Sequence, residues 1–208
     1  MTSHANTITR APNGDVAAPE EPPIVPAALT RRQEPLGARF WGVLRIALGW
    51  VFLWAFLDKL LALGFSTGRD GETGVVDRFG DAAWINGGSP TEGFLSFGLN
   101  TTGFFEDLYS SFAGQAWVDW IYMLSMLGIG AALIAGIAVR PAAIAGVVWM
   151  AMFYTASAIW PANNPFLDDH VVYAIALAGI AAVSAGRYLG LGRRWERLDI
   201  VRRHPFLR

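Results

Sequence analysis

The chain has 208 residues, of which 53% are hydrophobic and 16% are charged, and its formal net charge is −1. Soluble domains carry about 25% charged residues, so this composition favours a protein in contact with the lipid bilayer and gives no reason to expect a nucleic-acid partner. The lack of cysteine excludes disulfides and thiolate chemistry, and the three histidines, His4, His170 and His204, argue against a protein-only zinc site or a histidine-ligated haem.

The first segment, residues 1–35, is rich in proline and is expected to be a disordered cytoplasmic tail. Four apolar stretches follow, each close to the roughly 20 residues that a helix needs to cross a bilayer. They are about Phe40–Phe65, Trp117–Val139, Ala142–Trp160 and His170–Leu189. The sequence therefore predicts an all-α integral membrane protein, with a four-helix transmembrane bundle at 36–190 and a basic cytoplasmic tail at 191–208.

Arginines are concentrated on one side of this predicted topology. They precede the first span, occur between the second and third spans at Arg140, and follow the fourth span. The long loop at 66–116 has two arginines against seven acids. By the positive-inside rule, we expect a multi-pass protein of the cell inner (plasma) membrane with both termini in the cytoplasm.

The loop at 66–116 is too long and too aromatic for a slack linker. Phe105, Leu108, Tyr109 and Phe112 follow one another at helical spacing, with acids between them. We expect one or two short amphipathic helices that lie over the extracytoplasmic mouth of the bundle. They form either a packed cap or a lid over a substrate.

The first span contains three charged residues, although charges inside a bilayer are costly. Arg45 is near the cytoplasmic end, where it either snorkels to the surface or serves a site. Asp58 and Lys59 are near the other end and point about 100° apart, so each is expected to find a partner on another helix. These charges either lock the helices together or line a substrate site.

The segment "NNPFLDDHVVYAIAL" places two acids and a histidine at the start of the fourth span. Asp168 or Asp169 can cap the helix, where free backbone N–H groups favour an anion. His170 and Tyr173 are three residues apart and therefore share a face. A protonatable histidine beside an acid and a tyrosine suits a quinone head group. Alternatively, His170 is an interfacial residue whose ring is satisfied by Asp168 or a loop carbonyl.

Three segments together resemble the DoxX/DoxD family of small four-helix membrane proteins. They are Arg45–Leu60, "WINGGSPTEGFL" at Trp84–Leu95, and Asn163–Leu177, and the likeness extends over about residues 38–190. The resemblance implies a redox role at the membrane, as in the DoxD-like subunit of a thiosulfate:quinone oxidoreductase. The polar positions that match the family pattern are Arg45, Lys59, Asn164, Asp169 and His170.

These observations lead to three hypotheses. The first is a subunit of a quinone-linked oxidoreductase, with Lys59, Asp169 and His170 as catalytic residues and Arg45, Asn164 and Tyr173 binding substrate. The chain has no motif for a metal, flavin or haem, so quinone would accept the electrons and a protein partner would hold any other redox centre. The second is a non-catalytic accessory or scaffold subunit of a respiratory membrane complex. A small transporter ranks last, because paired broken helices are not evident.

Overall fold

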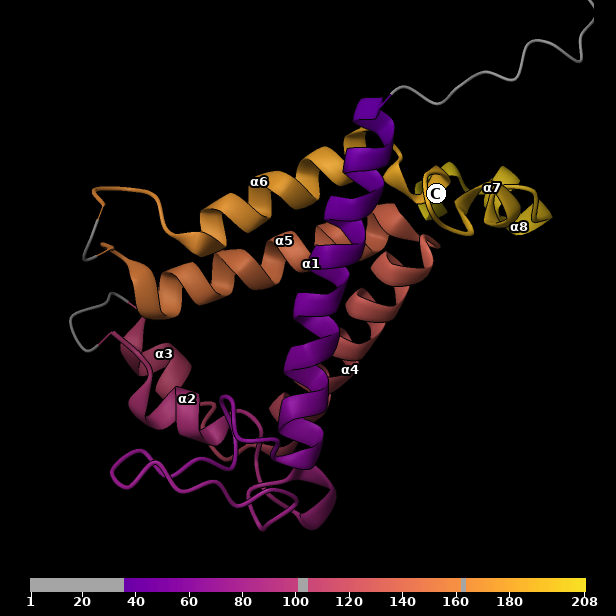
Figure 1. Cartoon of the computed structure of the whole chain (residues 1–208). Coiled ribbons are helices and arrows are strands. Elements are labelled where there is room, and N and C mark those ends of the chain that lie inside the picture. Colours follow the sequence, from indigo (N-terminus) through magenta and orange to yellow (C-terminus); the bar gives the residue numbers. More distant parts are fainter. Residues whose placement is uncertain (1–35, 101–104, 162–163) are drawn as a thin grey trace, which may run out of the picture. The chain divides into compact units, whose positions relative to one another are not determined.

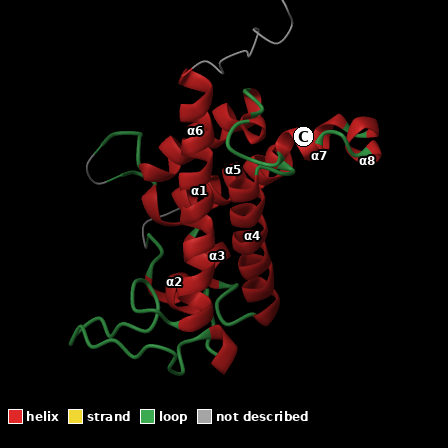
Figure 2. Ribbon diagram, turned by 45° about the vertical axis from the view of Figure 1, so that its right-hand side comes forward, coloured by secondary structure: helices red, strands yellow, loops and turns green. Residues whose placement is uncertain are grey.

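The computed structural model of the chain describes residues 36–100, 105–161 and 164–208 (Figure 1). The tail expected at 1–35 lies outside the described residues. Helices make up the regular structure of the described part, apart from one isolated antiparallel bridge between Arg69 and Val76 (Figure 2). The all-α prediction is therefore confirmed for these residues.

Within the described residues, three helices are long and apolar enough to cross a membrane. They are α1 (Leu36–Leu61), α4 (Ala116–Ala135) and a helix from Val139 to Ser157. The last of these combines α5 (Val139–Phe153) with most of a π-helical turn, η3 (Tyr154–Ala158). Well under half of each apolar window is buried inside the protein, so large apolar surfaces on these helices are left for contact with lipid.

The fourth apolar helix, α6 (Asp169–Ala182), is shorter than the stretch to Leu189 that the sequence suggested. Its 14 residues reach about 21 Å at 1.5 Å per residue, against about 30 Å for the hydrocarbon core. The helix ends because Ser184 adopts a left-handed φ of 52° and the chain enters a 3₁₀ turn, η4 (Ala185–Arg187). That turn brings the following carbonyl groups towards α1.

The α1 helix packs against α4, and α5 packs against α6 (Figures 1 and 2). Further contacts join α4 to α5 and α1 to α6. Glycine allows the contact between α1 and α4 to be close. A Cβ atom at Gly130 would lie 2.7 Å from the backbone nitrogen of Leu53. The buried core between the helices includes Leu48, Phe52, Met123, Met126, Leu133, Leu177 and Ile180.

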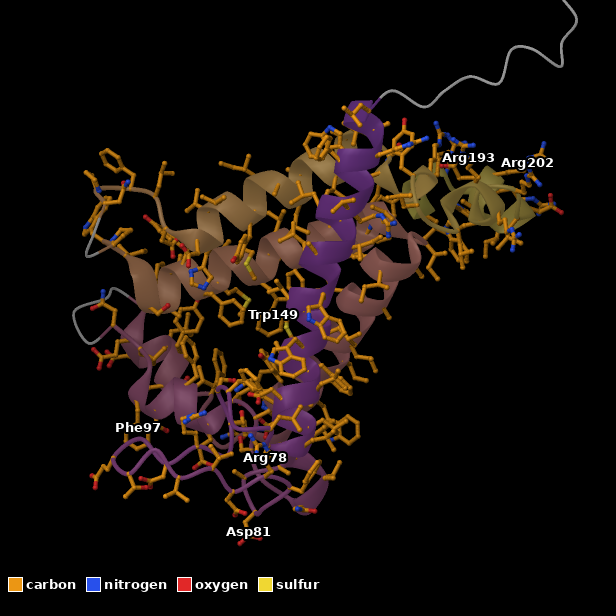
Figure 3. All side chains as sticks on the ribbon, viewed as in Figure 1. Arg78, Asp81, Phe97, Trp149, Arg193 and Arg202 are labelled. Carbon is orange, nitrogen blue, oxygen red and sulfur yellow. The ribbon has the colours of Figure 1, made fainter. Side chains whose placement is uncertain are left out.

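The chain between α1 and α4 contains a 3₁₀ turn, η2 (Trp84–Asn86), and two short helices, α2 (Glu92–Phe97) and α3 (Glu106–Ser110). In α2, Leu95 is buried and Phe97 is 90% exposed. Figure 3 shows Phe97 at the outer surface of this region. The α2 helix therefore has a buried inner face and an exposed outer face.

The C-terminal residues 191–208 also fold, as α7 (Gly192–Trp195), α8 (Asp199–Arg203) and a final 3₁₀ turn, η5 (Pro205–Leu207). The Trp195 indole nitrogen donates to the Leu207 carbonyl at 2.6 Å, which closes the segment on itself. The stretch predicted as a basic tail is thus a structured element (Figure 1).

Candidate functional site

A cavity of about 250 Å³ lies where the C-terminal end of α1 meets α2, α3, α4 and α5, and it is called the aromatic cavity below. Figure 3 shows Trp149 in the space between α5 and α1. The aromatic residues that line the cavity are Phe94, Tyr109, Phe112, Tyr122, Trp149 and Phe153. The lining comes from several elements far apart in the sequence, so it exists only in the folded chain.

Two pairs of aromatic rings in the cavity wall contact each other edge to face. The Tyr122 and Trp149 rings lie 5.4 Å apart, centre to centre, at an interplanar angle of 89°. The Phe94 and Phe153 rings lie 6.0 Å apart at 88°. Aromatic pairs are favourable at such distances and angles, so each ring helps to hold its neighbour in position. The wall is therefore a preformed apolar surface.

Lys59 supplies the positive charge of the aromatic cavity. It stands in the last turn of α1, where the helix dipole favours a cation. Its ammonium nitrogen lies 3.4 Å from the Thr67 hydroxyl and 5.9 Å from the centre of the Tyr122 ring. No carboxylate of the described residues forms a salt bridge with it. The Lys59 ammonium thus keeps donor capacity for a ligand in the cavity.

A second cavity, of about 460 Å³, adjoins the first and is called the polar cavity. The two cavities share Lys59, Ser66, Pro90 and Phe94. The polar cavity is otherwise lined by small and hydroxylated residues, which are Thr67, Gly68, Ala82, Ser89 and Gly93. Lys59 therefore lies at the boundary between an aromatic and a polar space.

The Asp58 side chain binds the start of the loop that follows α1. The expectation that Asp58 has a partner on another helix was therefore wrong. The side chain is 1% exposed and accepts from the Phe65 amide at 3.1 Å and from the Ser66 amide at 2.9 Å. The Ser66 hydroxyl donates to the same carboxylate at 2.7 Å. The chain folds back at the end of α1, so the nearest donors are local ones.

Asp119, in the first turn of α4, binds the loop to that helix. One carboxylate oxygen accepts from the Ser89 hydroxyl at 2.9 Å, the Thr91 amide at 3.1 Å and the Thr91 hydroxyl at 2.6 Å. Asp119 is 7% exposed, so these bonds replace the water that a buried carboxylate loses. They fix Pro90 and Thr91, which line the aromatic cavity.

Arg45 is completely buried and does not snorkel to the surface. Its guanidinium donates to the carbonyls of Leu133 and Ile134 near the end of α4. It also donates to the carbonyls of Tyr188 and Leu189, each at 3.1 Å. Arg45 and Lys59 are about 21 Å apart along α1, so Arg45 lies away from both cavities and joins three parts of the fold.

The remaining predicted residues lie around the start of α6. Asp168 caps the helix by accepting from the Val171 amide at 3.1 Å, and its other oxygen is 2.5 Å from Nδ1 of His170. Asp169 is exposed. The Asn164 side chain accepts from two loop amides and thereby shapes the turn before the helix. Tyr173 packs against the core.

Of the predicted residues, only Lys59 lines either cavity. The sequence interpretation missed Tyr122, Trp149 and Phe153. Trp149 and Phe153 are four residues apart, which places them on one face of α5, so their helical spacing was a usable signal. Tyr122 had no such signal, because its proximity to Lys59 depends on the packing of α1 against α4.

Comparison of the chain with models of known protein families, with curated proteins and with solved structures finds no match. The resemblance to the DoxX/DoxD family therefore stays a prediction. What the site can bind follows from its own residues. An ammonium group beside an aromatic wall suits a flat apolar ring that carries hydrogen-bond acceptors.

Proposed function

We propose that the chain is a membrane-embedded, quinone-binding subunit of a quinone-linked oxidoreductase. The observation that supports this most strongly is the position of Lys59 at the rim of the aromatic cavity. A quinone head group is a flat ring with two carbonyl oxygens, so it needs apolar walls and a few donors. Lys59 offers an ammonium donor, and the Tyr122 ring belongs to the same wall.

The size of the aromatic cavity supports a ring-sized ligand. Its volume of about 250 Å³ is just below the roughly 300–1,000 Å³ of most small-molecule sites. That volume suits a single head group better than a flavin or a haem. Met152 lines the cavity and is 37% exposed on α5, so an isoprenoid tail can leave past this residue towards lipid.

The protein's residues would position the quinone and donate hydrogen bonds to it. Reduction of a quinone to a quinol takes up two electrons and two protons. Electron density that builds on the carbonyl oxygens during reduction is stabilised by a nearby ammonium, because charge-assisted hydrogen bonds are the stronger ones. The polar cavity beside Lys59 has room for water molecules, which would supply the protons. We assign the oxidation of the electron donor to a protein partner.

The proposal includes the topology of the chain in the membrane and its membership of the DoxX/DoxD family. We assign residues 36–190 to a four-helix transmembrane domain, in which α6 and the turns that flank it make the fourth crossing. The arginine distribution supports cytoplasmic termini in the inner membrane, with the loop between α1 and α4 on the opposite side. The three DoxX/DoxD-like segments support a thiosulfate:quinone type of reaction for the complex.

Quinone binding to the purified full-length chain tests the proposal. A short-tailed ubiquinone or menaquinone analogue is titrated in detergent, and the quenching of tryptophan fluorescence is followed. Lys59→Met removes a donor that contributes about 1.5–3 kcal/mol, so the affinity should fall about 10- to 100-fold. Ile121→Ala changes a 51% exposed residue beside Tyr122 and serves as the matched control, with unchanged affinity.

The same experiment separates the proposal from its main alternative, a non-catalytic accessory subunit. If the chain is an accessory subunit, the parent chain should bind quinone no better than the Lys59→Met variant does. The parent chain and the variant would then both still be isolated with the same membrane complex. Equal, weak quinone affinity in the parent chain and in Lys59→Met would therefore contradict the proposed site.

A further inference from the structure

The C-terminal segment, Leu189–Arg208, is a folded element with no part in the site at Lys59. It carries six arginines against two acids. The segment is not part of the three helices that are long enough to cross a membrane, because all three lie earlier in the chain. Its composition and its position in the fold therefore call for a separate explanation.

The C-terminal segment is fastened to the ends of the membrane-capable helices. The Leu191 amide donates to the carbonyl of Ala135, the last residue of α4, at 2.8 Å. The Arg140 amide, in the first turn of α5, donates to the Arg208 carbonyl at 2.7 Å. These bonds hold the segment at the level where α4 ends and α5 begins, which is where apolar helices leave the hydrocarbon core.

Five of the six arginines of the segment are exposed at its surface. Figure 3 shows Arg193 and Arg202 on the outside of α7 and α8. Arg194, Arg197 and Arg203 are also exposed. One further arginine just before the segment, Arg187, binds Glu196 at 2.8 Å, and this pairing takes up one of the two acids. The surface of the segment is therefore strongly positive.

Large apolar side chains are exposed among these arginines. Leu198 is 48% exposed, Ile200 58% and Phe206 57%. These three residues fall within nine positions of the sequence, and exposed apolar side chains that gather in one region can mark an interaction surface. Arginines interleaved with exposed leucine, isoleucine and phenylalanine are typical of elements that lie in the interface between lipid head groups and acyl chains.

We propose that the C-terminal segment lies on the surface of the bilayer, with its arginines bound to the phosphate groups of anionic phospholipids and its exposed apolar side chains inserted beneath them. A basic segment next to a membrane helix gains about 1 kcal/mol per Lys or Arg at an anionic surface, which corresponds to about fivefold in the binding equilibrium. The bonds that hold the segment at the ends of α4 and α5 place it where these helices would meet the bilayer surface, which favours lipid over an acidic protein partner.

Spin labelling of the full-length chain tests this inference. Because the chain has no cysteine, Ile200→Cys gives a single site for a nitroxide label. The labelled protein is reconstituted into vesicles of phosphatidylcholine alone or of phosphatidylcholine with phosphatidylglycerol. Collisions of the label with oxygen, which partitions into lipid, and with a water-soluble nickel complex report its depth. Thr73→Cys, in the exposed part of the loop between α1 and α4, is the control.

We expect the label at Ile200 to be reached by oxygen and protected from nickel in the vesicles with phosphatidylglycerol, and more exposed to nickel without it. Combined Arg194→Gln, Arg197→Gln and Arg203→Gln should shift that equilibrium about a hundredfold towards water. The control should be open to nickel in both lipids. A label at Ile200 that is open to nickel in both lipids, or equally protected in both, would overturn the inference without any need for the arginine variants.

Discussion

The ring of Phe153 stands between His170 and the aromatic cavity. Its centre is 5.7 Å from the centre of the His170 ring, and Phe153 itself lines the cavity. His170 therefore reaches a ligand in the cavity only through its packing on Phe153, whereas Lys59 lines the cavity directly.

We expect His170→Ala to affect quinone binding far less than Lys59→Met does. The substitution removes the pairing with Asp168 at 2.5 Å and one contact to Phe153, both outside the cavity lining. A change of about twofold or less in affinity corresponds to the 0.5 kcal/mol typical of substitutions outside special sites. A loss as large as that of Lys59→Met, measured in the same titration, would instead place His170 in contact with the ligand.

Arg45→Leu is expected to destabilise the fold strongly. The guanidinium serves four backbone carbonyls, and each buried acceptor left without a partner costs about 1–3 kcal/mol. Arg45→Lys should recover only part of this loss, because an ammonium cannot reproduce the planar fork of the guanidinium. Thermal unfolding in detergent measures the effect, with Arg39→Gln at an exposed position of α1 as the control. Similar melting temperatures for Arg45→Leu and the control would show that the carbonyls need no donor.

The two glycines of α4, Gly128 and Gly130, should respond in opposite ways to alanine. A Cβ at Gly130 would lie 2.7 Å from the backbone nitrogen of Leu53, so α1 and α4 must separate, at a cost of about 1–3 kcal/mol. A Cβ at Gly128 meets no atom within 4 Å, and alanine favours the helix by up to about 1 kcal/mol. Thermal unfolding of both variants decides the matter. Equal effects would mean that α1 and α4 do not pack as closely as described.

Asp119→Ala should release the loop from α4 near the aromatic cavity. The substitution leaves the Ser89 and Thr91 hydroxyls and the Thr91 amide without their acceptor. Hydrogen exchange measured by mass spectrometry is expected to increase in the peptide that contains these residues and not in peptides from α6. Asp107→Ala, at an exposed position of α3, is the matched control. Unchanged exchange in the Asp119 variant would mean that other contacts hold the loop.

Much of the helical framework could be predicted from the sequence, because long apolar runs carry a strong signal. The runs containing α1, α4 and α5 were found, and Asp168 was one of two candidates for the cap that it forms. The early end of α6 was missed. Ser184 is not a residue that usually marks a left-handed turn, and the stretch after it is still apolar enough to continue the pattern.

The partners of the charged residues were harder to predict than their positions. Arg45 and Lys59 were singled out correctly as unusual, but the acceptors of Arg45 are backbone carbonyls, which leave no trace in the sequence. The Tyr188 carbonyl is 143 residues away along the chain. The aromatic cavity was missed for a related reason, since its wall is assembled from loop and helix residues whose mutual approach depends on tertiary packing.

The most direct test of quinone binding at Lys59 is photo-crosslinking with a quinone that carries a diazirine on its ring. The full-length chain in native membranes is irradiated, digested and mapped by mass spectrometry, with and without an excess of the unmodified quinone. We predict crosslinks to Phe94, Tyr122 and Trp149 that the unmodified quinone suppresses and that Lys59→Met weakens. Crosslinks confined to exposed residues of α4 and α5 such as Leu124 and Val148, unaffected by competition, would contradict the account.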